Sequence, residues 1–539
     1  MRLPTSSCFV LVGVTALAST QAQGSTSRAA TGAPAAAKGQ DKVQGGSVLG
    51  IRQAVERAQR LEGKVVKPFL VNGVKLDQLE VDRQTVYMVG QRTLQQKLIE
   101  LIVEDQMAEQ IKAGAPKKMF DVIEDDVQKH IEKTIKDWKT KNPGGNFYAQ
   151  LAKTNTTPEE YVTIQRSTIL FDKVFFRGIP SKWPQITREA IVASGGAQGT
   201  AFFNKFAEAV KEGQDVPPLW LHICRTWVIK KMQEWADVRY ASDGVPPDVI
   251  LSVNGRVWKT EHAMRTLALK IKPEDRVRAL VDIVLQTSLR QELKKAGMWL
   301  SDEQFRKEFE DYRKPYDDTP FTVKVLAMSF KGYPSFEVYK ARWRLERSFE
   351  HMIAKEINDD TLGAHLVKAR AFLSDGRTSL EAIRMPAFDD AAGTWRKDGF
   401  AAARGEAEQV MRKIESGAMT FEDAMSKHAI WPEHFKDQGK LSGKSLNEIR
   451  QELKENEYTD FIQGYSVAEI LFYDVAIGAV AGPLRGQDGY YICKITQRLA
   501  PTGTVTLGEK NQRDLVRQDF LSHRFLSWAN EVAGRTRVE

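Results

Sequence analysis

Alternating apolar and polar positions mark one segment late in the chain. In "GPLRGQDGYYICKI", residues 482–495, a Gly-Pro pair predicts a turn, and the residues after the second glycine follow the period of two of a strand. Tyr491, Cys493 and Ile495 share one face of this strand. Tyr490, Ile492 and Lys494 share the other, where the lysine indicates contact with solvent. The pattern therefore predicts a closing strand with Tyr491 on its more apolar face.

Two earlier segments repeat a longer pattern. "FLVNGVKLDQLEVDR", residues 69–83, and "ILSVNGRVWKTEHAMR", residues 250–265, each place a short apolar strand before Asn-Gly, which favours a hairpin turn, and then begin a polar helix. In each copy an amphipathic helix begins 27 residues after the strand valine and ends in Ala-Gly, a helix stop signal. A charged helix, a segment opened by Phe147 or Phe321 and a proline-led helix follow in both copies.

This shared order predicts an internal duplication. The first mainly helical module is expected at residues 47–179, the second at 248–377, and a helical connector at 180–247.

Residues 378–500 follow a different plan. A strand, two helices, a glycine loop in "FKDQGKLSG", a short helix and the closing strand predict a small α+β domain built around a sheet. The last segment, residues 501–539, predicts a helix with an apolar stripe that must be buried. The stripe consists of Leu521, Phe525, Trp528 and Val532. The predicted fold class is therefore α+β and multidomain.

The N-terminus changes the expected location of the protein. Residues 1–22 combine one arginine, a short apolar run and small residues, which is typical of a secretory signal peptide. Residues 23–46 are rich in Gly, Ala and Ser and predict a flexible tether. No later stretch predicts a transmembrane segment. We therefore expect an exported protein, periplasmic or otherwise extracytoplasmic.

The net charge and the cysteine positions say little about function. Lys and Arg number 78 against 70 Asp and Glu, giving a net charge of +8 that is spread along the chain, whereas nucleic-acid binders gather basic charge on one face. We expect no nucleic-acid partner. Behind the leader, Cys224 and Cys493 lie in different predicted domains, which favours two buried thiols and leaves a disulfide possible.

Several of these segments together resemble known families. Residues 380–498 resemble a parvulin-type (PpiC-type) peptidyl-prolyl isomerase domain in the strand "AIRMPAF", the helices of "EAEQVMRKIESGAMTFEDAMSKHA", the loop "DQGKLS" and the ending "GAVAGPLRGQDGYYICKI". The duplicated modules resemble the N-terminal chaperone region of SurA-type periplasmic folding factors. The final helix resembles the C-terminal helix that packs onto that region. The resemblance implies a SurA-like chaperone that binds unfolded or extended polypeptide clients.

The resemblance also assigns candidate site residues. The paired histidines of parvulins fall on Arg384 and Tyr491, so both are absent. The aromatic residue of the proline pocket falls on Val467 or Ala468, a few residues before Tyr473. Isomerising an X-Pro bond requires a slot for the ring and polar groups that stabilise a twisted amide, against a barrier of about 20 kcal/mol. A permanently charged arginine and a tyrosine do not titrate near neutral pH, so we expect a degenerate site with feeble activity.

Three functions remain open at this stage. The first is a non-enzymatic exported chaperone. The second is an active peptidyl-prolyl isomerase with a divergent site, and the third is an envelope assembly or scaffold protein that uses the parvulin fold for docking. His428, Glu433 and His434 cluster in one loop, but their spacing is a weak metal signal, and we expect exposed loop residues. We expect neither a metal nor a small-molecule cofactor.

Overall fold

The computed structural model describes most of the chain beyond residue 69. The described residues are 48, 50–55, 70–153, 156–177, 236–268, 270–271, 273–317, 319, 321–389, 394–396, 398–428 and 439–539, with short helical pieces between 188 and 229. The expected signal peptide and tether lie outside them, as does most of the expected connector.

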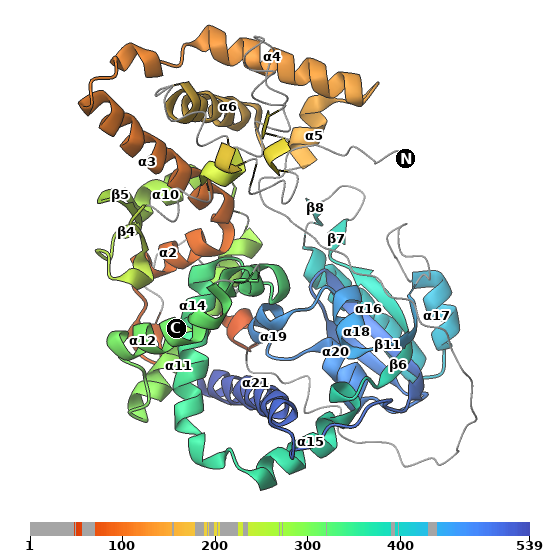
Figure 1. The fold of residues 1–539 in the computed structure, drawn as a ribbon. Coiled ribbons are helices and arrows are strands. Elements are labelled where there is room, and N and C mark those ends of the chain that lie inside the picture. The colour runs from red at the N-terminus through yellow and green to blue at the C-terminus, as the bar shows by residue number, and fades with distance from the viewer. Residues whose placement is uncertain are drawn as a thin grey trace. The chain divides into compact units, whose positions relative to one another are not determined.

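Residues 45–539 form one compact unit, within which two series of elements follow the same order. Each series runs hairpin, helix, long helix, helix, short helix, helix (Figure 1). The first series consists of β1 (Leu70–Val71), β2 (Val74–Lys75), α2 (Gln78–Val89), α3 (Gln91–Lys112), η2 (Lys117–Phe120), α4 (Glu124–Lys141), α5 (Phe147–Lys153), α6 (Pro158–Asp172) and η3 (Lys173–Arg177). The second consists of β4 (Val249–Val253), β5 (Arg256–Lys259), α10 (Thr260–Leu267), α11 (Pro273–Lys295), α12 (Asp302–Asp317), α13 (Val323–Val325), η6 (Leu326–Phe330) and α14 (Phe336–Met352). The predicted order of elements is confirmed, while their origin by duplication stays a prediction.

The Asn-Gly pairs form the two hairpin turns. Asn72 and Asn254 have φ of 52° and 50°, and the glycine after each is also left-handed, as a two-residue turn of this kind requires. Each hairpin pairs with one further segment. In the second series this is β3 (Val238–Tyr240), which pairs with β4 and is followed by η5 (Ala241–Asp243). In the first series residues 537–539 pair with β1, with Val538 opposite Val71.

The long helices end as the sequence predicts. Helix α3 stops at Lys112 and helix α11 at Lys295, and each is followed by Ala-Gly. Gly114 and Gly297 adopt φ of 102° and 69°, a conformation that glycine tolerates at a helix C-terminus.

Beyond α14 the chain builds the predicted α+β domain around a four-stranded antiparallel sheet of order β10-β11-β6-β9. The elements are η7 (Ala354–Glu356), α15 (Asp359–Leu373), β6 (Arg377–Pro386), β7 (Phe388–Asp389), β8 (Thr394–Trp395), α16 (Gly399–Glu415), α17 (Phe421–His428), β9 (Lys440–Lys444), α18 (Leu446–Glu452), α19 (Glu457–Gln463), α20 (Val467–Glu469), η8 (Ile470–Asp474), β10 (Val480–Arg485) and β11 (Gly489–Leu499).

Two expectations for this domain are wrong. The segment predicted as a glycine loop contains strand β9, because Leu441 pairs with Leu380 of β6 and the sheet satisfies its backbone groups. The Gly482-Pro483 pair predicted as a turn lies inside strand β10, where the pairing with β11 is irregular between Ala481 and Leu484.

The alternation predicted for the closing strand is confirmed. Tyr491, Cys493 and Ile495 pack in one apolar cluster with residues of α18 and α20, whereas Tyr490 and Ile492 pack in another with α16 and α17. Helix α16 crosses β6 and β11 on that second face (Figure 1). The sheet therefore has helices on both faces, and Lys494 pairs with Glu422 at 2.7 Å.

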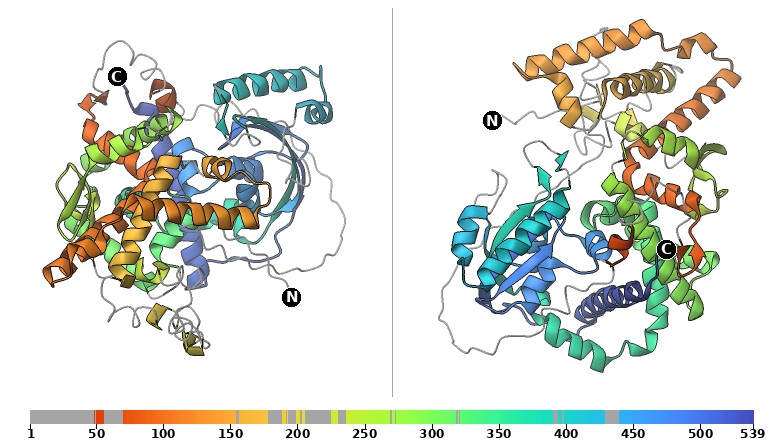
Figure 2. Two further views of the ribbon diagram at one scale, coloured as in Figure 1. Left: turned by 90° about the horizontal axis from the view of Figure 1, so that it is seen from above. Right: turned by 180° about the vertical axis from the view of Figure 1, so that it is seen from behind.

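The apolar stripe of the last helix, α21 (Lys510–Arg535), is buried as predicted. The helix packs against α11 and α15 (Figure 2), and Phe525 stacks edge-on against Phe349 of α14. The Arg342 guanidinium of α14 lies over two other rings, 3.7 Å from the ring centre of Phe525 and 3.8 Å from that of Phe461 in α19.

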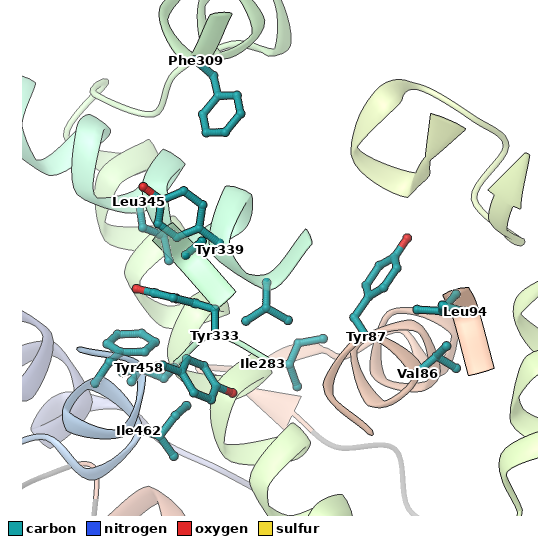
Figure 3. Close-up of a cluster of buried hydrophobic side chains, with 14 of the residues drawn as sticks. Val86, Tyr87, Leu94, Ile283, Phe309, Tyr333, Tyr339, Leu345, Tyr458 and Ile462 are labelled. Atoms are coloured by element: carbon teal, nitrogen blue, oxygen red, sulfur yellow. The ribbon is translucent and has the colours of Figure 1, made fainter. Parts of the chain in front are cut away.

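Helix α19 thus inserts into the main helical core, where Tyr458 and Ile462 pack near Tyr333 and Tyr339 (Figure 3). None of the helices in the described ranges combines the length and apolar composition needed to span a bilayer.

Candidate functional site

Adjacent strands bring the two candidate catalytic residues together. Tyr491 of β11 is the direct register partner of Arg384 in β6. Both side chains point to the sheet face that α18 and α20 cover, since they alternate with Ile383 and Ile492 on the opposite face. Each exposes only 1% of its surface. The two residues are therefore neighbours on adjacent strands and almost wholly buried.

Asp488 joins the pair from the turn between β10 and β11. Arg384 Nη2 lies 2.9 Å from Asp488 Oδ2, and Tyr491 Oη donates to Asp488 Oδ1 over 2.5 Å. Lys454, which follows α18, places its Nζ 3.2 Å from Asp488 Oδ2. A buried cation and a buried carboxylate thus satisfy each other, as buried charges must.

The protonation states of this triad are fixed at neutral pH. Burial raises the pKa of Asp488, but Arg384, Tyr491 and Lys454 together outweigh burial and hold it below its usual value. Burial, together with the Asp488 charge, raises the pKa of Tyr491 well above its usual value. The triad can therefore hold a turn in place, but it offers no group that exchanges a proton near pH 7.

A glycine forms the wall beside the Tyr491 ring. A Cβ atom on Gly486 would lie 2.4 Å from Cε2 of Tyr491, closer than real carbon atoms approach. Gly486 also donates its backbone N–H to the carbonyl of Gly489 over 2.9 Å, which closes the turn that carries Asp488. The small residue at position 486 thus permits the buried position of the tyrosine.

The positions expected in the proline pocket are buried in a helix start. Val467 and Ala468 have no exposed surface. Their N–H groups donate to the carboxylate of Glu455 over 2.8 and 2.9 Å, and Ser466 Oγ donates to it over 3.1 Å. Burial raises the pKa of Glu455, while these hydrogen bonds act against the rise. The side chains of Val467 and Ala468 pack into the apolar core, whereas the resemblance implies that they contact substrate.

Tyr473 lies apart from the triad. It follows α20 in η8, contacts Phe472 edge-on and is half-buried. Its electrostatic neighbours are Asp519 of α21 and Glu469, so it faces the last helix.

Helix α18 covers the face of the sheet that holds Arg384 and Tyr491. Leu446, Ile449 and Leu453 pack in the same apolar cluster as Tyr491 and Val467. Arg450 on this helix pairs with Glu469 at 3.1 Å and with Asp460 of α19. Side chains of α18 therefore fill the space next to the triad.

The loop residues and cysteines noted in the sequence form no metal or catalytic site within the described residues. His428 ends α17 and is half-buried, while Glu433 and His434 lie outside the described residues. No group of three metal-ligating side chains occurs within the described ranges. Cys493 is a free, buried thiol, and burial raises its pKa to about 12. Cys224 lies outside the described residues.

Sequence reasoning missed Asp488, Lys454 and Glu455. One signal was available for helix α18, which precedes Lys454 and Glu455 in the chain. Ser445 and Glu448 form a reciprocal capping box, a pattern that announces a helix start. Asp488 gives no comparable signal, because an acid between two glycines is typical of any exposed turn.

Comparisons with known proteins give distant matches only. No protein-family model matches the chain, and no curated protein does. Solved structures similar to it include a peptidylprolyl isomerase (PrsA) from Bacillus cereus, at 15% identity over 53% of this chain and 89% of that one, with a TM-score of 0.19. Another, from Bacillus anthracis, is 14% identical over 48% and 95%, with a TM-score of 0.20. The foldase protein PrsA from Streptococcus pneumoniae is 16% identical over 52% and 87%, with a TM-score of 0.16. At these identities and TM-scores the similarity establishes neither a family nor a function for this chain.

Proposed function

We propose that this protein is an exported chaperone that binds unfolded polypeptides, and that its parvulin-like domain, residues 378–500, contributes little isomerase activity. The observation that carries the proposal is the closed triad of Arg384, Asp488 and Tyr491. A prolyl peptide would have to displace α18 and break a buried ion pair to reach these groups. We therefore assign the binding of unfolded polypeptides to the helical part of the chain.

Exposed aromatic side chains on the second series support client binding. Phe321 precedes α13 and Phe330 ends η6, with 51% and 63% of their surfaces exposed. Their ring centres lie 6.1 Å apart in an edge-to-face contact. Paired exposed phenyl rings are costly in water and are typical of surfaces that bind apolar partners.

We also propose that the helical part arose by duplication, with modules at residues 47–179 and 248–377. The support is the shared order of elements and the matching pairing of Val253 with Val238 and of Val71 with Val538. A duplicated frame offers two related surfaces to one extended client, which raises the effective concentration of the second contact.

An aggregation-suppression assay tests the proposed function. The full mature chain should keep a chemically denatured protein soluble at a stoichiometric ratio, without nucleotide. The double variant Phe321→Ser, Phe330→Ser should suppress aggregation several-fold less. Val367→Ser is the matched control, since Val367 is 74% exposed on α15, far along the chain from these rings. A wild-type chain without any suppressing effect would contradict the proposal.

Export is a separate part of the proposal and rests on residues 1–22. Cleavage is expected near Ala22. N-terminal sequencing of protein purified from its native host should find a chain that begins within a few residues after Ala22. A mature chain that retains Met1 would contradict export by this route.

A further inference from the structure

We propose that the Asn72-Gly73 turn is a site of spontaneous deamidation in the folded protein, and that contacts around Asn254-Gly255 slow the same reaction there several-fold. Both pairs form the tips of hairpins, and all four residues are exposed to solvent. The modification is independent of client binding and concerns the lifetime of the fold.

The reaction needs only water and the residues of the turn. The backbone nitrogen of the glycine attacks Cγ of the asparagine, so that a new C–N bond forms and the Cγ–Nδ2 bond breaks. The amide group leaves as ammonia and takes the proton of the glycine nitrogen. Water then opens the succinimide ring to aspartate or isoaspartate. Glycine hinders this attack least because it carries no Cβ, and a Cβ placed on Gly73 or Gly255 would meet no other part of the protein within 4 Å.

The two sites have the same local sequence and backbone conformation. Each reads Val-Asn-Gly, at residues 71–73 and 253–255, and the asparagines have φ of 52° and 50°. The two asparagines should therefore lose ammonia at the same rate in an unfolded chain. A difference in the folded chain must come from the contacts that hold each side chain.

The partners of the reacting amide groups differ in charge. Asn254 Nδ2 donates to Oδ2 of the Asp105 carboxylate over 2.8 Å, whereas Asn72 Nδ2 donates to the neutral amide oxygen of Gln291 over 2.9 Å. Arg256 Nε lies 3.2 Å from the other oxygen of Asp105 and leaves Oδ2 to Asn254. The side chain must release its Nδ2 bond before ammonia can leave. Hydrogen bonds to charged groups are the stronger kind, and the difference corresponds to about fivefold less released side chain at Asn254.

The segments that pair with the two hairpins differ in extent. Strand β3 pairs with β4 at three positions, whereas residues 537–539 pair with β1 through the isolated bridge between Val71 and Val538. Each segment donates one backbone N–H to Oδ1 of its asparagine, over 2.8 Å from Asp237 and 2.9 Å from Arg537. These two bonds are alike, but the shorter pairing opens more often and frees Asn72 more often.

Deamidation at Asn72 would loosen the first hairpin. Both products lack the Nδ2 donor whose hydrogen bond Gln291 of α11 accepts. Isoaspartate also lengthens the backbone of the turn by one atom, so the two-residue turn no longer fits between β1 and β2. The contact between the first hairpin and α11 is then lost.

Peptide mapping by mass spectrometry tests the inference on the full mature chain, incubated folded in a mildly alkaline buffer. We expect Asn72 to convert several-fold faster than Asn254. In the same buffer with denaturing urea, the two sites should convert at equal rates. Equal rates in the folded chain, or faster conversion of Asn254, overturn the inference.

Two reciprocal variants test the cause. Asp105→Asn gives Asn254 a neutral partner and should speed its conversion several-fold without changing Asn72. Gln291→Glu gives Asn72 a charged partner and should slow its conversion several-fold without changing Asn254. Asp360→Asn, at an exposed position of α15, is the matched control and should change neither rate. A general loss of fold would speed both sites together, so a variant that changes both rates alike, or neither, contradicts the assignment.

Discussion

Asn72 and Asn254 hold equivalent places in the two hairpins, and each donates its side-chain amide to the long helix of the other series. Asn72 Nδ2 lies 2.9 Å from Gln291 Oε1 of α11, and Asn254 Nδ2 lies 2.8 Å from Asp105 Oδ2 of α3. Each Oδ1 also accepts a backbone N–H from the segment that pairs with its hairpin, from Arg537 over 2.9 Å and from Asp237 over 2.8 Å. The hairpin of each series is therefore hydrogen-bonded to the long helix of the other series.

Replacing either asparagine should destabilise the whole helical unit. Asn254→Gly removes the two side-chain hydrogen bonds but tolerates the positive φ, and should cost about 1–3 kcal/mol of unfolding free energy. Asn254→Ala adds backbone strain of about 1–2 kcal/mol. Asn72 should behave in the same way. Urea unfolding of the four variants checks this, and equal stability of the wild type and Asn254→Ala would contradict this role of the hydrogen bonds.

Breaking the buried ion pair should be costly. Arg384→Met leaves the Asp488 carboxylate buried without its main partner, which should lower the unfolding free energy by about 3–5 kcal/mol. The control Arg404→Met removes an exposed helix pair with Glu408 and should cost less than about 1 kcal/mol. Adding Asp488→Asn to Arg384→Met should recover part of the loss. A loss in Arg384→Met no larger than in the control would argue against a closed triad.

The loss of unfolding free energy at acid pH should also depend on the Arg384–Asp488 ion pair. Because the folded-state pKa of Asp488 lies below its unfolded value, the stability it contributes is present above about pH 4 and is lost as the pH falls through the folded-state pKa. Arg384→Met should therefore lose less stability than the wild type between about pH 4 and pH 2. Parallel acid-unfolding curves for the two proteins would contradict this assignment.

Two glycine substitutions should have opposite effects. Gly486→Ala places its Cβ against the fully buried Tyr491 ring and should cost about 1–3 kcal/mol through overpacking. Gly405→Ala, in the interior of α16, meets no atom within 4 Å and should stabilise the protein by about 0.5–1 kcal/mol. Thermal unfolding of the two variants distinguishes them. A neutral Gly486→Ala would mean that the tyrosine ring has room to move away.

Asp282 should make the protein less stable at neutral pH than near pH 4. It lies fully buried in α11, accepts from Gln84 and from Gln286 over 2.9 Å, and burial raises its pKa to about 6. The folded state therefore binds the proton more tightly, and the unfolding free energy falls as the pH rises from about 4 to 6. The difference between this raised pKa and the ordinary pKa of an aspartate corresponds to about 3 kcal/mol of unfolding free energy.

Asp282→Asn should accordingly raise stability above pH 6 by up to about 3 kcal/mol and flatten the profile between about pH 4 and 6. Asp360→Asn, at an exposed position of α15, is the matched control and should change neither. Urea unfolding across this pH range is the measurement, and an unchanged slope in Asp282→Asn would contradict the assignment.

Local patterns predicted much of the fold. Alternation placed Tyr491 on the correct face of β11, and the Asn-Gly pairs identified both hairpins, because these signals depend on residues adjacent in sequence. The apolar stripe through Phe525 likewise predicted a buried last helix. Its partner Arg342 could not be predicted, since the contact joins residues far apart in the chain.

The candidate site was predicted only in part. Alternation along β11 indicated that Tyr491 lies on the apolar face, but nothing in the sequence indicated that the charged Arg384 beside it is buried as well. The burial of the pair depends on apolar residues of α18, which pack in the same cluster as Tyr491, and on Asp488 in a turn. Strand β9 was missed for a similar reason, because pairing with β6 overrides the loop preference of its glycine.

A prolyl-isomerisation assay on the full mature chain tests the central claim most directly. The parvulin-like site should be closed while the helical part still binds clients. At concentrations of the chain that suppress aggregation, the cis-to-trans rate constant of a prolyl tetrapeptide should remain within about twofold of the uncatalysed rate. A rate within tenfold of an ordinary parvulin, lost in Tyr491→Phe, would contradict the account and identify the buried triad as an active centre.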